Sequence, residues 1–575
     1  MNPTLSLAGK WRFQIDSRDA GLRERWQLDA SRSTAWKSID VPGYFEQHGF
    51  DGDQNIGWYQ RVFEIPEKIP PGRLGLAFSG INAAAQVWLN GKQLAALANE
   101  SDRFVADATT TLLLGANVVT VRVPDHGAPG GIMIGAWLTE YENVADLACG
   151  RYAVHPARRS ADWVRDAVVY EVYLRSFSAE GTFVGLEKRL DELKALGVSV
   201  LWLMPIHPVG VEKRKGALGS PYAIRDFYGI NPEFGTLSDF RRLLDAAHRR
   251  GLRLILDLVA NHTSWDNPLI AEHPEWYRRD ERGALVSPLD WTDVAQLDYN
   301  VPELRRYMIE MMLYWMRDIG IDGFRCDVTG LVANEFWSEA RPRLDAVKDV
   351  IMIAEDDAPR QHVQAFDLTY DWWTYQALGR LASGKMNPTS LAAILANERL
   401  DYPADSLRLR FSDNHDLCAW HKPGMARYGP AAARAAAVLT FTLPGVPLIY
   451  NGQEAGNRTA LPLFERLPID WTADDQGMRA LFIALCQIRA DSSALRRGKI
   501  EFLTTGIDTD VLAFKRIGAE ETLLVLINCG LEPRNVDWNK QNLGPPRLLL
   551  ASTSYNSNSN RALLPPLGYW VGRCP

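Results

Sequence analysis

The chain has 575 residues, of which 46% are hydrophobic and 23% charged, as is usual for globular proteins with a sizeable buried core. A formal net charge of −7 argues against a nucleic-acid partner, which requires a basic surface, and no apolar run reaches the roughly 18 residues of a membrane helix. The six cysteines form no CxxC pair, and the N-terminal stretch lacks the pattern of a signal peptide. We therefore expect a cytoplasmic protein without a membrane partner, or a secreted or periplasmic one if a leader was removed.

Residues 1–145 alternate apolar and polar positions in short runs, separated by Gly, Asn, Asp and Pro. The runs are WRFQI, RVFEI, LGLAF, AQVWL and VVTVRV, and their spacing predicts a β-sandwich of two antiparallel sheets. The segments LAGKWRFQID, VPGYFEQHG, WYQRVFEIP, LAFSGINAAAQVWLNGKQLA and GANVVTVRV resemble the N-terminal sugar-binding-type jelly roll of the β-galactosidase and β-glucuronidase family. That resemblance implies a galactose-binding-like fold and leaves the role of this segment open.

The pattern changes further along the chain. Residues 146–166 have no clear period and are interpreted as a linker. From residue 167 to 494, apolar strand-like runs alternate with amphipathic helical stretches, which predicts an α/β fold, a (β/α)8 TIM barrel. A polar stretch at about 263–297 is expected to form a short inserted loop domain. Strand-like runs return in residues 495–575 and predict a C-terminal antiparallel β-domain.

Polar residues stand at the ends of four predicted barrel strands. In chain order they are Asp257, Asn261 and His262 in DLVANH, Arg325 and Asp327 in GFRCDV, Glu355 in IAED, and Asn414, His415 and Asp416 in FSDNHD. Because parallel barrel strands end at one face, these side chains should meet at the barrel mouth.

Two of the converging acids suit a retaining glycosidase. Arg325 lies two residues before Asp327, so both side chains point to the barrel interior, and the guanidinium should keep Asp327 ionised as a nucleophile. Glu355 should be the carboxyl group with the raised pKa, able to protonate a leaving oxygen. Asp416 is a third carboxylate that could stabilise positive charge on the sugar.

The motifs DLVANH, GFRCDV, IAED and SDNHD occur in this order, with supporting matches in SPYAIRDFYGINPEFGT, QLDYNVPELR and TLPGVPLIYNGQE. On these motifs residues 167–575 resemble the α-amylase family, glycoside hydrolase family 13. The resemblance implies Asp327 as nucleophile, Glu355 as general acid/base and Asp416 as transition-state stabiliser.

The same resemblance implies further roles around these acids. The implied substrate contacts are Tyr222, His262, Arg325, His415 and Arg466, and the implied structural residues near the site are Asp257 and Asn414. The chemistry requires no cofactor, but the resemblance suggests a structural Ca²⁺ site at Asn261 and Asp298.

The sequence also departs from the family pattern. Ala223 stands where α-glucosidase-type members carry an Asp that holds the non-reducing end, which argues against an exo-glucosidase. Gly330 and Leu331 replace the Lys and His of many α-amylases, and Pro462 replaces the Asp that accompanies Arg466 in neopullulanase-like members. These positions leave the choice of glucan open.

We therefore predict a retaining α-glycoside hydrolase that acts on α-1,4-linked, or also α-1,6-linked, glucans or maltooligosaccharides. The sequence does not decide whether the protein forms a homo-oligomer. A cyclomaltodextrinase or neopullulanase-like enzyme and an α-glucan transglycosylase remain alternatives, because they share these residues. A β-glycosidase would need an Asn-Glu pair at the fourth strand end, and Asn334-Glu335 and Asn397-Glu398 lie in helix-like context. A non-catalytic carbohydrate-binding protein would not need all three acids.

Overall fold

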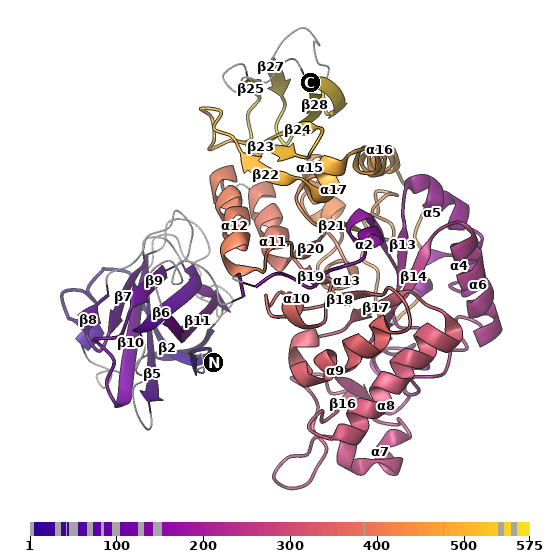
Figure 1. Cartoon of the computed structure of the whole chain (residues 1–575), viewed down its shortest axis with the longest axis horizontal. Coiled ribbons are helices and arrows are strands. Elements are labelled where there is room, and N and C mark those ends of the chain that lie inside the picture. The colour runs from indigo at the N-terminus through magenta and orange to yellow at the C-terminus, as the bar shows by residue number, and fades with distance from the viewer. Residues whose placement is uncertain are drawn as a thin grey trace. The chain divides into compact units, whose positions relative to one another are not determined.

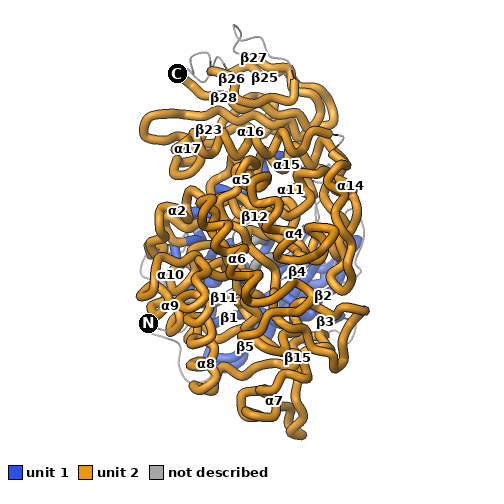
Figure 2. Tube along the Cα trace, turned by 90° about the vertical axis from the view of Figure 1, so that its right-hand side faces the viewer, with its two compact units in different colours: residues 1–154, 385–402 blue, residues 155–384, 403–575 orange. Residues whose placement is uncertain are grey.

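The chain divides into two compact units (Figure 2). One unit comprises residues 1–154 and 385–402, and the other residues 155–384 and 403–575. The computed structural model describes residues 5–28, 36–41, 43–44, 56–65, 73–81, 85–94, 104–124, 131–141, 152–153, 155–383, 386–474, 476–538, 546–553 and 561–575.

The N-terminal unit contains two antiparallel sheets, in the orders β1-β11-β6-β9, with β4 beside β11, and β3-β2-β5-β10-β7-β8. Alternate residues of β2, such as Trp11 and Phe13, point into one apolar core with Leu76 and Phe78 of β6. The predicted N-terminal sandwich is confirmed in these two sheets. Its elements are β1 (Leu5–Ser6), β2 (Gly9–Asp16), η1 (Trp26–Leu28), β3 (Lys37–Val41), β4 (Gly43–Tyr44), β5 (Ile56–Ile65), β6 (Arg73–Ile81), β7 (Gln86–Leu89), β8 (Lys92–Gln93), β9 (Phe104–Asp107), β10 (Gly115–Pro124) and β11 (Gly131–Tyr141).

The second unit is built on a closed barrel of eight parallel strands, as predicted (Figure 1). The first strand pairs with both the second and the last, which closes the barrel. Each strand is short, and all of its residues are buried except Arg253 at the start of β14, as expected when helices cover the outside. The strands are β12 (Val169–Val172), β13 (Val200–Leu203), β14 (Arg253–Leu258), β17 (Gly323–Cys326), β18 (Ile351–Ala354), β19 (Leu368–Tyr370), β20 (Leu407–Arg410) and β21 (Val446–Tyr450).

Helices follow the barrel strands, and several of the helices begin at a residue whose side chain caps them. Thr236 and Asp239 form a reciprocal capping box at the start of α6. The helices are α2 (Asp162–Asp166), α3 (Leu174–Phe177), α4 (Phe183–Glu187), α5 (Leu190–Leu196), α6 (Leu237–Arg249), α7 (Leu269–Glu272), η3 (Pro274–Trp276), α8 (Pro302–Leu313), η4 (Tyr314–Ile319), η5 (Thr329–Leu331), α9 (Asn334–Asp345), α10 (Gln361–Gln364), α11 (Trp372–Ala382), α12 (Pro388–Asp401), α13 (His415–Trp420), α14 (Gly424–Arg427), α15 (Pro430–Thr442), α16 (Met478–Asp491) and α17 (Ser493–Arg497). The helix α12 belongs to the first unit.

Two further groups of strands lie outside the barrel, one in the stretch after β14 and one at the C-terminal end of the chain. Within the stretch expected as an inserted domain, β15 (His262–Ser264) pairs antiparallel with β16 (Val294–Gln296). The C-terminal antiparallel domain is present, with the strands β22 (Lys499–Phe502), β23 (Val511–Ile517), β24 (Thr522–Asn528), β25 (Arg534–Asp537), β26 (Arg547–Ala551), β27 (Arg561–Leu564) and β28 (Tyr569–Cys574).

The expected linker lies only partly within the described residues. Residues 146–151 fall outside them, whereas α2 forms the end of that stretch. Within the described ranges, no helix has the length and apolar character needed to cross a membrane.

A glycine at the start of β17 permits the close approach of two barrel strands. Gly323 has a φ of +152°, and a Cβ atom there would lie 2.0 Å from the Ile351 carbonyl oxygen of β18. Only glycine tolerates this contact. The GFRCD motif therefore begins with a glycine because a side chain at this position would clash with β18. These two strands carry Asp327 and Glu355 to the mouth.

A buried ion pair joins α9 to the strands behind the site. The Arg341 guanidinium donates to both Asp367 oxygens, at 2.7 and 3.3 Å, and to the carbonyl of Ala365. Asp367 also accepts from the backbone N–H of Met352. The pair therefore links α9, β18 and the start of β19 at one buried point.

We expect Asp367→Ala to lower the free energy of unfolding of the barrel unit by about 3–5 kcal/mol, because it leaves the Arg341 charge buried and unpaired. Urea denaturation followed by tryptophan fluorescence measures this. Asp318→Ala, which removes a surface partner of Arg317, should leave the transition in place. Equal transitions for both variants would contradict the structural role of Asp367.

Candidate active site

The predicted strand-end residues meet at the C-terminal mouth of the barrel. Asp257 on β14 is the register partner of Arg325 on β17. Asp327 and Glu355 follow β17 and β18 directly, and Asp416 lies in the first turn of α13, after β20. The structure thus gathers residues that are up to 159 positions apart in the chain, counted from Asp257 to Asp416.

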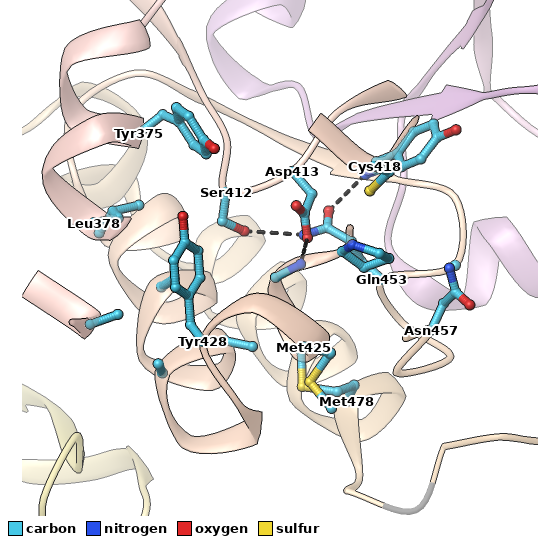
Figure 3. Close-up of a pocket in the computed structure, with 18 of the residues that line it drawn as sticks. Tyr375, Leu378, Ser412, Asp413, Cys418, Met425, Tyr428, Gln453, Asn457 and Met478 are labelled. Carbon is cyan, nitrogen blue, oxygen red and sulfur yellow. Dashed lines mark hydrogen bonds between the residues drawn. The ribbon is translucent and has the colours of Figure 1, made fainter. Parts of the chain in front are cut away.

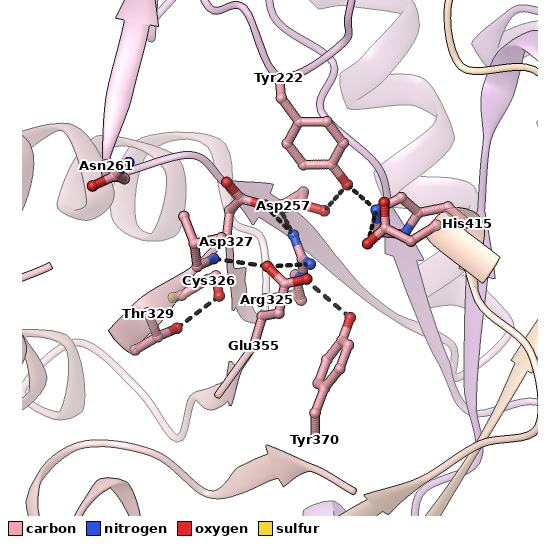
Figure 4. A network of polar contacts seen from close by, with 12 residues as sticks. Tyr222, Asp257, Asn261, Arg325, Cys326, Asp327, Thr329, Glu355, Tyr370 and His415 are labelled. Carbon is pink, nitrogen blue, oxygen red and sulfur yellow. Dashed lines mark hydrogen bonds and ion pairs between the residues drawn. The ribbon is translucent and has the colours of Figure 1, made fainter. Parts of the chain in front are cut away.

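Arg325 is the hub of this cluster (Figure 4). Its Nη1 lies 2.8 Å from Asp257 and 2.9 Å from Asp327, and its Nη2 lies 2.9 Å from Glu355. The side chains of Arg325 and Asp257 are fully buried, while 9% of Asp327 and 12% of Glu355 remain exposed. Asp257 is therefore placed to hold Arg325, and the other two acids face a substrate.

Three aromatic rings surround the same guanidinium. Its central carbon lies 5.1 Å from the ring centre of Trp202, 5.6 Å from Tyr370 and 5.9 Å from Tyr222. The Tyr370 hydroxyl also accepts a hydrogen bond from Arg325 Nε, at 3.2 Å. Ring faces stabilise a desolvated cation, so the aromatic residues help to keep this charge inside the barrel.

One guanidinium faces three carboxylates, and the surplus of negative charge affects their protonation. Burial raises the pKa of Glu355 to about 7, against the opposing effect of Arg325 and with a further rise from Asp327 and Asp416. Burial likewise raises the pKa of Asp327 to about 6, although Arg325 lowers it. Arg325 alone was expected to keep Asp327 ionised; the structure adds a burial effect that outweighs it and leaves Glu355 as the carboxyl group that holds its proton at the higher pH.

The backbone between the two acids is strained. Val328 has a φ of +36°, in the left-handed region that a β-branched residue rarely adopts. In this conformation its N–H donates to Glu355 at 2.7 Å. A strained residue that aims its backbone N–H at a carboxylate is a device found at functional sites.

A second set of hydrogen bonds leads from the hub to His415. The Tyr222 hydroxyl lies 3.1 Å from Asp257 and 2.8 Å from His415 Nε2, and the Tyr222 and His415 rings stack at 5.5 Å. His415 Nδ1 bonds to the fully buried carboxylate of Glu171 on β12, and its Nε2 lies 3.5 Å from Asp416. His415 is thus held between two acids.

The pKa of His415 reflects these neighbours. Burial lowers it, but the carboxylates of Asp416 and Glu171 outweigh burial and raise the pKa to about 9. The ring is therefore a cation at neutral pH and donates from both nitrogens.

The turn that carries Asp416 is fixed by capping. Asn414 accepts a hydrogen bond from the Leu417 N–H at 2.9 Å and so begins α13. Asp416 keeps 35% of its side chain exposed, so it faces the opening of the mouth. Asn414 has the structural position near the site that the sequence suggested.

The other predicted residues lie further from the hub. His262 is buried, bonds to the backbone of Tyr222, and packs against the Trp291 ring at 5.5 Å. Burial lowers its pKa to about 4, so the ring is neutral. Arg466 is exposed and donates to the Ala179 carbonyl.

Asn261 and Asp298, the residues expected at a calcium site, have other hydrogen-bond partners in the structure. Asn261 donates to the His262 ring, and Asp298 accepts two hydrogen bonds from Asn300. Ca²⁺ needs six to eight oxygen ligands, usually with several carboxylates. Among the residues that the structure describes, no three His, Cys, Asp or Glu side chains cluster as a metal site. The calcium site therefore stays a prediction.

A pocket lies next to the turn that begins α13, and Asp413 and Cys418 are among the residues that line it (Figure 3). Asp413, which precedes the cap residue, is buried, accepts from the Gly424 N–H at 2.8 Å and pairs with Arg427. Tyr375, Tyr428 and apolar side chains line most of the remaining wall. None of the predicted site residues lines this pocket, so its contribution is to hold the turn before Asp416.

Sequence reasoning did not single out Glu171, Tyr370 or Trp202 as site residues. Trp202 is buried and donates to Asp257 at 3.2 Å. Glu171 carried a usable signal, since it is the only charged residue in the strand VYEV, and a buried charge requires a partner. Tyr370 had no comparable signal, because a buried tyrosine at a strand end is ordinary.

Comparisons with known proteins agree with this geometry. A family model for the alpha amylase catalytic domain matches residues 157–280 and 271–493. The chain is similar to alpha-amylase MalA of Haloarcula japonica, with 31% identity over 66% of this chain and 58% of that relative. It is also similar to a cyclomaltodextrinase of a Bacillus species, with 24% identity over 68% and 79% of the two chains. A crystal structure of an alpha-amylase from Lactobacillus plantarum matches with a TM-score of 0.64 and 32% identity, covering 72% of this chain and 100% of that one.

We expect Glu171→Gln to lower the pKa of His415, because the variant removes one of the two carboxylates that keep the ring charged. NMR of ¹³C-labelled histidine should show that His415 stays charged up to pH 8 in the native protein and titrates at lower pH in the variant.

Glu454→Gln provides the matched control. Glu454 is equally buried at the mouth, but it bonds to the Tyr170 hydroxyl and not to His415. The His415 signal should follow the native titration in this variant. An unchanged titration in Glu171→Gln would show that Glu171 does not set the charge of His415.

Proposed function

The chain belongs to the α-amylase family, and on this premise we propose that it is a retaining α-glycoside hydrolase acting on α-1,4-linked glucans or maltooligosaccharides. The observation that carries the proposal is the placement of Asp327 and Glu355 on adjacent nitrogens of one buried guanidinium, Arg325. Two carboxyl groups held this close suit the retaining mechanism, in which they lie about 5 Å apart, because no water has to fit between nucleophile and sugar.

In the first step the Glu355 carboxylic acid protonates the glycosidic oxygen, and the carbon–oxygen bond to the leaving sugar breaks. The Asp327 carboxylate forms a bond to the anomeric carbon, which gives a covalent glycosyl-enzyme. In the second step the Glu355 carboxylate accepts a proton from water, the water oxygen bonds to the anomeric carbon, and Asp327 leaves as a carboxylate.

The remaining residues stabilise the positive charge that develops on the sugar ring in the transition state of each step. The transition state resembles an oxocarbenium ion, so the exposed carboxylate of Asp416 is placed to stabilise it. The charged His415 holds Asp416 and has a donor directed toward the mouth, where sugar hydroxyls would lie. Tyr222 is proposed to stack on the sugar ring beside the nucleophile, and His262 to contact its hydroxyls.

A second candidate is cleavage of cyclic dextrins or transfer to another sugar. The similarity to a cyclomaltodextrinase favours it, and a sugar hydroxyl can replace water in the second step without any change in the acids. The departures at Ala223 and Leu331 lie on the parts of the mouth that contact rings beyond the cleaved bond. Substrate choice, unlike the mechanism, therefore depends on these loops.

For the N-terminal unit we propose a jelly roll of the sugar-binding type found in the β-galactosidase family. Its two antiparallel sheets around a common apolar core support this, together with the motif order in residues 1–145. Its role in this protein would be support of the catalytic unit or binding of a glucan.

We expect Asp327→Asn to lower kcat on maltotriose by several orders of magnitude, since the amide cannot form the glycosyl-enzyme. Release of reducing sugar measures the rate, and NMR of the first product should show an α-anomer from the native enzyme. Asp318→Asn, on the surface, is the matched control and should retain full activity.

Starch, pullulan, cyclodextrin and maltotriose should be tested beside aryl β-galactoside and β-glucuronide. Cleavage of the α-glucans supports the proposal, and their products separate the hydrolase from the transglycosylase. Turnover of the β-glycosides alone, or full activity of Asp327→Asn, would refute it.

The pH dependence follows from the two acids. Asp327 must be ionised to attack, so kcat/KM should fall as the pH drops through about 6. Glu355 must hold its proton for the first step, so kcat/KM should fall as the pH rises through about 7. A profile on maltotriose from pH 4 to 9 measures both limbs, and an alkaline limb that is unaltered in Glu355→Gln would contradict this assignment.

A further inference from the structure

One aromatic side chain at the barrel mouth is mostly exposed. The side chain of Trp420, at the end of α13, has 62% of its surface accessible. Every other Trp, Tyr or Phe with a described side chain is buried or only partly exposed. An exposed tryptophan does not contribute the large hydrophobic free energy that its burial would give. Its exposure therefore suggests that a ligand or partner binds there.

The position of Trp420 relates it to the catalytic acids. It lies four residues after Asp416 on the same short helix, so both side chains project from the same helix face. The cap residue Asn414 fixes where this helix begins. Trp420 therefore stands one helical turn from a carboxylate of the proposed active site.

The indole is held in place by its neighbour. The ring of Phe464, from the loop after β21, packs against Trp420 edge-on at 5.9 Å. Phe464 itself is anchored, since its carbonyl accepts from the Leu218 N–H at 3.0 Å and its ring packs against the buried cluster around Tyr173. This support orients Trp420 before any ligand arrives.

The face of the ring remains available. Three partly exposed tryptophans of the same unit are covered by cations: Trp265 by Lys213 at 3.2 Å, Trp471 by Arg189 at 3.7 Å and Trp163 by Arg253 at 4.0 Å. Over the described part of the chain, no cationic side chain lies on Trp420. The flat surface suits a ligand with an apolar face.

Other exposed apolar side chains lie in loops that follow the barrel strands. In the barrel unit, Val211, Leu289, Leu331 and Leu467 are exposed and all lie in loops that follow barrel strands. These loops form the C-terminal face of a barrel, where the site lies. The loops on the side of the barrel that carries the site thus expose several apolar side chains.

We propose that Trp420, supported by Phe464, is a stacking platform that binds a glucose ring of the α-glucan beyond the two rings joined by the cleaved bond. The apolar C–H face of a glucose ring matches the indole in size and polarity. The inference rests on the proposed function and adds to it a preference for substrates long enough to reach Trp420.

The test compares Trp420→Ala with the native enzyme on maltoheptaose and maltotriose. Loss of the platform should raise KM for maltoheptaose about tenfold, because an aromatic contact of this kind is worth roughly one factor of ten in affinity. The value of kcat should be largely retained, since Trp420 does not touch the reacting atoms. Trp420→Phe keeps a ring and should lie between the two.

Ile483→Ala is the matched control, because Ile483 is an exposed apolar residue on α16, outside the strand-following loops of the mouth. It should leave both KM values unchanged. If Trp420→Ala is unstable by circular dichroism, Trp420→Leu retains an apolar contact with Phe464 and still lacks the flat face.

The outcomes separate the two proposals. A native enzyme that cleaves neither oligosaccharide refutes the proposed function. A native enzyme that cleaves both, with the same KM for maltoheptaose in Trp420→Ala or Trp420→Leu, refutes the platform alone. Calorimetric titration of maltoheptaose into the Asp327→Asn protein, with and without Trp420→Ala, should show the same tenfold difference in binding without turnover.

Discussion

The buried guanidinium of Arg325 is the interaction on which the catalytic end of the barrel depends. A charge without solvent is costly unless it is paired, and here three carboxylates and three aromatic rings compensate it. The pairing also sets geometry, because β14, β17 and β18 must be in register for Asp257, Asp327 and Glu355 to reach one side chain. Gly323 makes that register sterically possible. Fold and chemistry thus share a single constraint.

Charge balance explains the different roles of similar residues. One cation cannot hold three buried carboxylates ionised at low cost, so a proton remains with Glu355 near neutral pH. At the other side of the mouth Glu171 and Asp416 together keep His415 charged. We propose that these groups act together on one sugar ring, with Glu355 as proton donor, Asp327 as nucleophile and Asp416 as the stabilising carboxylate that a glycosyl transition state requires.

Sequence reasoning predicted the barrel and the position of its mouth because both follow from local patterns. The alternation of apolar runs and amphipathic stretches specifies strand and helix, and carboxylates after apolar runs can only lie at strand ends. Contacts made across the barrel were harder to predict. Glu171 and His415 are 244 residues apart, and neither residue type reveals the other. Arg466, Asn261 and Asp298 were expected near the site by resemblance. In the structure Arg466 donates to the distant Ala179 carbonyl, whereas Asn261 and Asp298 bond to residues next to them in the chain. The roles of the site residues remain predictions for experiment.

The sequence by itself determined the class of fold, the family and the three candidate acids. Each of these follows from short motifs that can be recognised, in their order, from the sequence alone. Only the tertiary structure decided that burial raises the pKa of Asp327 as well as that of Glu355, and that His415 is charged whereas His262 is neutral. The reason is physical, because a pKa depends on burial and on the sum of charges brought together from distant segments. The structure also decided that Trp420 is exposed and held beside Asp416. A tryptophan in a sequence is most often part of a core, and only its packing shows when one is left facing the solvent.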